Sequence, residues 1–151
     1  MLFNKEQDIS GLKPFNDTEA DTRILLHLAH AANQGHQIAL VRTVYSDVVI
    51  LAIHWFASLG LSELWVCLGT GKKIRDIPIH TLSAQLGPSR CIALSLFHAV
   101  TGCDTVSHIL GCGRKTAWSA WQSTTGLTDT LVALSSDPQQ LGHTVSAHAN
   151  P

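Results

Sequence analysis

A chain of 151 residues is long enough for one domain with a buried core and short for two. Apolar residues make up 45% of the chain and charged residues only 14%, which excludes disorder throughout. The formal net charge of -1 shows no basic excess, so composition alone does not indicate a nucleic-acid partner.

The N-terminal part of the chain divides into a leader and a first helix. Residues 1–17 mix polar residues with glycine and proline without a clear period, and we expect them to form a leader. Apolar residues then recur at helical spacing, which predicts a helix from Thr18 until Gly35 ends it. A domain over 18–134 and a disordered tail over 135–151 complete the expected organisation.

Two apolar runs predict strands: Ile38 to Thr43, which is rich in β-branched residues, and Glu63 to Leu68. Between them, Val48 to Leu51 resumes the apolar run and leads into a helix predicted over Ile53 to Leu59. A helix between two such runs is typical of a βαβ unit. The expected fold class is therefore α/β, with a parallel sheet flanked by helices on both faces.

The second half of the chain is expected to be mainly helical. Gly69 to Lys73 reads as a turn, and Gly102 to Gly113 as a glycine-punctuated connection. Three further helices are predicted, over Thr81 to Leu86, Ser89 to Val100 and Arg114 to Trp121. The two tryptophans of the last helix, Trp118 and Trp121, lie three residues apart on one face and are expected to pack in the core.

Four acidic residues lie where chemistry could occur. Glu19 and Asp21 open the first helix, Asp47 follows the first strand at the edge where α/β sheets collect ligands, and Asp104 precedes a glycine-rich turn. Each has a structural alternative. Thr18 with Asp21 forms a capping box, Asp47 could satisfy backbone amides of a turn, and Asp104 could cap a helix.

A second pattern suits phosphate binding. Gly111 and Gly113 precede a helix, so backbone amides and the helix N-terminus could approach a phosphate closely, and Arg114 and Lys115 add positive charge. Such a segment would bind a nucleic-acid backbone without reading bases. The alternative is a plain turn between helices.

These patterns together resemble the flap-endonuclease and PIN-like family of metal-dependent nucleases. The stretch TGCDTVSHILGCGRKTAW, from Thr101 to Trp118, resembles the family's glycine-aspartate motif and helix-hairpin. Upstream, EADTRILLHLA is similar to its acidic helix start, and RTVYSDVVILA to its strand ending in two aspartates separated by one residue. Sequences of mobile-element-derived animal proteins carry the same order of motifs. The resemblance implies a PIN-like three-layer sandwich with a helix-hairpin at about 101–121.

The resemblance also implies a function. Glu19, Asp21, Asp47 and Asp104 would hold one or two Mg²⁺ or Mn²⁺ ions for the hydrolysis of phosphodiesters in DNA or another nucleic acid. Tyr45 stands where the family has the first aspartate of its strand pair. We therefore expect weak or no cleavage, and the alternative is an inactive nucleic-acid-binding or protein-interaction module derived from such a nuclease.

The family's opening strand has no counterpart in this chain, so we expect an exposed apolar sheet edge that favours association. The scattered cysteines and the absence of a secretory leader favour an intracellular, reducing compartment, with the nucleus as one candidate. The longest apolar run, Val48 to Phe56, is much shorter than the ~20 residues of a membrane helix, so no membrane role is expected.

A zinc site is an alternative to the acidic site. It would use residues of the soft and borderline types that zinc prefers, His98, Cys103, His108 and Cys112. Their spacing lacks a close Cys-x-x-Cys pair, and the glycine-aspartate motif accounts for the same region better.

Overall fold

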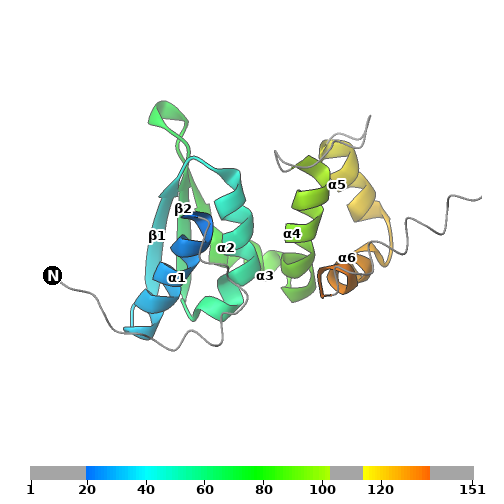
Figure 1. Cartoon of the computed structure of the whole chain (residues 1–151). Coiled ribbons are helices and arrows are strands. Elements are labelled where there is room, and N and C mark those ends of the chain that lie inside the picture. Colours follow the sequence, from blue (N-terminus) through cyan, green and yellow to red (C-terminus); the bar gives the residue numbers. More distant parts are fainter. Residues whose placement is uncertain (1–19, 103–113, 137–151) are drawn as a thin grey trace, which may run out of the picture.

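The computed structural model describes residues 20–102 and 114–136. The expected leader, the tail beyond residue 136 and the glycine-punctuated connection lie outside the described residues. Within them, strands and helices together confirm the α/β class. Figure 1 shows the strands with α1 and α2 on one side of the view, and α4, α5 and α6 on the other.

The sheet has the strand order β1-β2-β3 and is mixed. β1 (Ile38–Thr43) pairs in parallel with β2 (Glu63–Leu68), and both strands have the predicted bounds. β3 (Arg75–Pro78) pairs antiparallel with β2, so the expectation of a fully parallel sheet is wrong. Only a tight turn separates β2 from β3, and it contains one turn of 3-10 helix, η2 (Gly71–Lys73). A parallel neighbour would need a crossover of a dozen or more residues.

The helix after β1 begins earlier than predicted. α2 spans Ser46–Leu59, so Val48 to Leu51 belongs to the helix and does not continue a strand. Its buried residues, which include Val48, Val49, Ala52 and Ile53, recur at helical spacing. The run of β-branched residues looked strand-like locally, and burial of one helical stripe against the sheet overrides that preference.

The remaining helices are α1 (Ala20–Asn33), α3 (Ile79–Leu86), α4 (Pro88–Gly102), α5 (Arg114–Ser123) and α6 (Leu127–Ser136). Of these, α3, α4 and α5 follow the predicted order with longer bounds, and α1 lies within its predicted range. α6 was not predicted. It packs against α4, and its Leu131 is buried. Trp121 is buried as expected, and its ring lies against Trp118 with 5.3 Å between centroids.

The two faces of the sheet differ in burial. On one face, Leu64 and Val66 of β2 have no exposed surface, and α1 and α2 pack against each other above them. On the other face, Ile38 and Leu40 of β1 are 63% and 68% exposed. Within the described residues, the β1 part of this face is therefore exposed, and the expectation of helices on both faces is not met there. We call the exposed face, which carries the side chains of residues 38, 40 and 42 of β1 and 63, 65 and 67 of β2, the open face.

A row of polar residues crosses the open face. Arg42, Cys67 and Asp76 are partners in register across β1, β2 and β3. The Cys67 thiol hydrogen-bonds to the Asp76 carboxylate, which raises the pKa of the thiol, and the charge of Arg42 opposes this shift. The open face thus combines exposed apolar side chains with charges of both signs.

Across residues 20–102 and 114–136, none of the helices has both the length and the apolar character needed to cross a membrane.

Candidate functional site

Asp47 lies in the first turn of α2, just beyond the C-terminal end of β1. Tyr45 has extended backbone angles, φ -99° and ψ 127°, and ends the strand path before the helix begins at Ser46. Its amide nitrogen donates to Oγ1 of Thr43 at 3.1 Å, which stabilises this sharp change of direction. An acidic residue in the first turn interacts favourably with the helix dipole. Asp47 therefore has a structural role in addition to any chemical one.

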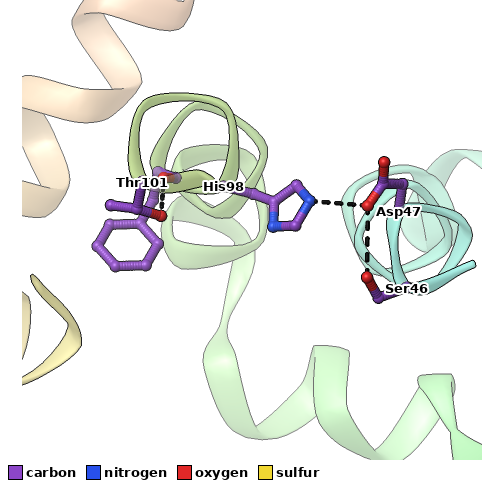
Figure 2. A network of polar contacts seen from close by, with 5 residues as sticks. Ser46, Asp47, His98 and Thr101 are labelled. Carbon is purple, nitrogen blue, oxygen red and sulfur yellow. Dashed lines mark hydrogen bonds and ion pairs between the residues drawn. The ribbon is translucent and has the colours of Figure 1, made fainter. Parts of the chain in front are cut away.

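The carboxylate of Asp47 contacts a histidine from a distant helix. Nε2 of His98 in α4 donates to Oδ1 of Asp47 at 2.9 Å, across 51 positions of sequence. Figure 2 shows the two side chains pointing toward each other from α2 and α4, with Ser46 beside Asp47. A carboxylate accepts but does not donate, so the shared proton is on Nε2. The contact fixes the imidazole orientation and leaves Nδ1 without a partner among the described residues.

A second polar contact joins the same helices. Oγ of Ser95 lies 2.9 Å from Nδ1 of His54, and the two contacts occur in opposite order along α2 and α4, so the helices run antiparallel. Burial lowers the pKa of His54 below its ordinary value of 6.5, while hydrogen bonds involving the backbone of Ile92 and Cys91 oppose the shift. The N-terminus of α2 is thereby held beside the last turns of α4.

A pocket of about 540 Å³ adjoins the Asp47–His98 contact. Its walls come from α2, α4 and α5, and its lining includes Ile50, Phe97, His98, Lys115 and Trp118. The rings of Phe97 and Trp118 meet edge to face, with 5.7 Å between centroids. Thr101 also lines the pocket, and its hydroxyl donates to the carbonyl of Phe97 (Figure 2). The pocket therefore combines aromatic walls with a cation and one imidazole.

The structure describes few of the residues expected to form the site. Glu19, Asp104, Gly111 and Gly113 lie outside the described residues. Asp21 belongs to the first turn of α1 and Arg114 begins α5, but the arrangement of their side chains is not described. Asp47 and Lys115 are described with their side chains, and Lys115 is exposed.

Tyr45, at the position that differs from the family, is 65% exposed and two residues before Asp47. Its phenol supplies no carboxylate at this edge of the sheet. Among the residues that the structure describes, no three His, Cys, Asp or Glu side chains are grouped so that they could hold a metal ion. Of the alternative zinc ligands, His98 is described and is bonded to Asp47, and the other three lie outside the described ranges.

The partnership of Asp47 with His98 was missed in the sequence. His98 was considered only as a zinc ligand, and nothing in the spacing of the two residues indicates a contact. A helical-wheel view of α4 places His98 one turn from Leu94 and Thr101, on the stripe that faces α2 and α5. This signal identifies an inward-facing histidine but does not identify its partner.

No protein-family model, curated protein or solved structure matches this chain. The resemblance to flap endonucleases and PIN-like nucleases therefore depends on the quoted motifs alone.

Proposed function

We propose that this chain is a divalent-metal-dependent nuclease-like domain that acts on nucleic-acid phosphodiesters, with an altered acidic set that leaves weak or no activity. The observation that best supports the proposal is the position of Asp47. It lies at the N-terminus of α2, past the C-terminal end of β1, which is the edge where α/β folds assemble catalytic groups.

Two other helices, α1 and α4, approach the same edge. Figure 1 shows α1 and β1 running in opposite directions, so the first turn of α1, which contains Asp21, lies toward the C-terminal end of β1. The His98–Asp47 contact brings the last turns of α4 to this edge as well. α4 ends at Gly102, two positions before Asp104. These directions favour convergence of the acidic residues.

The donor chemistry fits a hard cation in part. Asp47 offers carboxylate oxygens, the type of ligand that Mg²⁺ and Mn²⁺ prefer, on a side chain that is 45% exposed. When bound, such an ion would supply an activated water and charge stabilisation at the phosphate. The chain's own contribution is to orient Asp47 through His98 and Ser46, and to present Lys115 in the neighbouring pocket. Tyr45 leaves this edge one carboxylate short of the family pattern.

Metal titration tests the proposal without a substrate. Mn²⁺ should raise the melting temperature of the wild-type chain, because an ion that binds only the folded state stabilises it by about 2.7 kcal/mol at a hundredfold excess over Kd. Asp47→Asn and Asp104→Asn should reduce this shift. Asp129→Asn, at an exposed acid in the first turn of α6, is the control and should keep it. An equal shift in all four proteins, or none in the wild type, would contradict a metal site at Asp47.

Cleavage tests the activity itself. With Mn²⁺, the purified wild-type chain should cut flap and single-stranded substrates weakly or not at all, and Tyr45→Asp should increase cleavage by restoring the missing carboxylate. Residual nuclease competence is ruled out when both proteins leave these substrates intact.

The second candidate function is an inactive module that binds nucleic acid. The pocket beside α5 favours it, because aromatic walls and the exposed Lys115 suit a partner with flat rings and phosphates. Binding in this case persists in EDTA and weakens on Lys115→Gln. Lys73→Gln, at another exposed lysine on the β2–β3 turn, is the matched control. Fluorescence anisotropy with a labelled oligonucleotide measures the affinity of both variants. An affinity that Lys115→Gln leaves unchanged would exclude this pocket as the binding site.

A further inference from the structure

The outer edge of β1 is unpaired in the described part of the chain. β1 is the first strand of the order β1-β2-β3 and has a hydrogen-bonded neighbour on one side only. Its sequence, IALVRT, contains no proline and no lysine, and its single charge is Arg42 near its end. Soluble proteins usually protect an exposed edge with lysine, with proline or with a bulge. This edge therefore lacks the usual protection against pairing with another strand.

The backbone of β1 determines which residues could pair. The carbonyls of Gln37 and Thr43 accept hydrogen bonds from the β2 side, from the amides of Ser62 and Glu63 and from that of Gly69. Backbone groups alternate in direction along a strand, so odd-numbered residues face β2 and even-numbered residues face outward. Ile38, Leu40 and Arg42 consequently present their N–H and C=O groups at the free edge.

These three residues are compatible with a second copy of the same strand. In an antiparallel pair centred on Leu40, Leu40 lies opposite Leu40, and Ile38 lies opposite Arg42. All of these positions have outward backbone groups, so each opposed pair can exchange two hydrogen bonds. The same residues carry their side chains on the open face, where Ile38 is 63% and Leu40 is 68% exposed. Pairing would bring the most exposed apolar side chains of two copies together.

The charges also complement one another in this arrangement. The two Arg42 side chains are kept apart, because each lies opposite an isoleucine. Ile38 is itself the register partner of Glu63 in β2, and Glu63 is on the open face. Neighbouring strands are about 4.8 Å apart, so Arg42 of one copy and Glu63 of the other are separated by about 10 Å between Cα atoms. Two long side chains can span this distance over Ile38.

From these observations we infer that β1 forms a two-fold symmetric antiparallel pair with β1 of a second copy, centred on Leu40, which joins two sheets into one of six strands. The occupant of the edge is another copy of this chain because β1 is complementary to itself in hydrogen bonding and apolar contact, and Arg42 of each copy complements Glu63 in β2 of the other. The pair does not depend on the metal site, which lies beyond the C-terminal end of the strand.

The oligomeric state tests this pairing. Light scattering after size exclusion should show a dimer that dissociates on dilution. Leu40→Lys places two like charges directly opposite each other at the symmetry axis and should raise the dimer Kd roughly tenfold or more. Leu40 is exposed, so the variant monomer should fold normally, and circular dichroism checks this. Val100→Lys, at a 40% exposed apolar residue of α4, is the matched control and should remain dimeric.

A charge exchange tests the register. Arg42→Glu and Glu63→Arg should each weaken the dimer, because each opposes like charges across Ile38, and the double variant should recover part of the lost affinity. Hydrogen exchange provides a further readout. The amides of Ile38, Leu40 and Arg42 should become more protected as protein concentration rises, while those of Ala39 and Val41 should be protected throughout.

Several results would overturn the inference. A wild-type chain that stays monomeric at all concentrations shows that the edge is closed by the chain itself or remains free. A dimer that Leu40→Lys leaves intact shows that the copies meet elsewhere. Growth beyond a dimer shows that the contact is not a closed two-fold pair. None of these results would affect the Mn²⁺ titration of Asp47, so the two proposals fail independently.

Discussion

The covered and open faces of the sheet are built from alternate residues of the same strands, yet they meet different surroundings. On β2, Leu64 and Val66 are fully buried beneath helices, whereas Trp65 and Cys67, which alternate with them, are partly exposed. On β1 the contrast is larger, because Leu40 is 68% exposed and the adjacent Val41 is 9% exposed. The comparison shows that apolar composition predicts a strand, but only the packing of other elements decides which of its faces is buried.

The largest expected effect is the difference in lost stability between substitutions on the two faces. Leu64→Ala should destabilise the chain by about 2–5 kcal/mol, because it removes a fully buried side chain and leaves a cavity. Leu40→Ala should change stability by no more than about 0.5 kcal/mol in the monomer, because the side chain is mostly in solvent. Urea unfolding at low protein concentration measures both. Similar losses in the two variants would show that the open face is covered.

The second largest expected effect is a loss of stability in the turn between β2 and β3. Gly69 has a φ of +110°, and a Cβ at this position would lie 2.7 Å from the carbonyl oxygen of Lys73. Gly69→Ala should cost about 2–3 kcal/mol in stability. Gly71 has a φ of +56° with open space around it, so Gly71→Ala should cost only about 1 kcal/mol. Thermal unfolding compares them, and equal costs would mean that the close approach at Gly69 is relieved.

The smallest expected effect is the pH dependence of stability that His54 contributes. Burial lowers the pKa of His54 in the folded chain, so the unfolded chain, with the ordinary value of 6.5, binds the proton more tightly. This contribution to stability is therefore fully present above pH 6.5 and decreases as the pH falls below it. The loss should be a fraction of a kcal/mol, because His54 is only partly buried.

Unfolding of wild type and His54→Gln between pH 5 and 8, a range of ~3 units around the ordinary histidine pKa, measures this effect. Their difference in stability should be constant at neutral and mildly alkaline pH and shift against the wild type in acid. His36→Gln, at an exposed histidine before β1, is the control. A constant difference across the range would show that His54 is not the group responsible.

Much of the fold could be predicted because the signals are local. β1 and β2 have the predicted bounds, since each is a short apolar run between glycines or polar residues. α2 was predicted to begin at Ile53 because Val48 to Leu51 favours a strand locally, and contacts with the sheet and α4 instead extend the helix to Ser46. The antiparallel β3 was missed because its four residues, Arg75–Pro78, contain two charges and a proline.

For the candidate site, the sequence predicted the position of Asp47 but not its contact. Asp47 was singled out because it follows a strand, and its position past the C-terminal end of β1 agrees with that reasoning. Its contact with His98 could not be predicted, because it depends on the antiparallel packing of α2 and α4 across 51 positions.

By itself, the sequence determined the α/β class, the two parallel strands and the order of the helices after them, because periodicity and turn residues act over a few neighbouring positions. Only the tertiary structure decided that β3 runs antiparallel, that Ile38 and Leu40 of β1 are exposed within the described part of the chain, and that His98 contacts Asp47. These features depend on which apolar surfaces meet, and burial of a surface is a property of the whole folded chain.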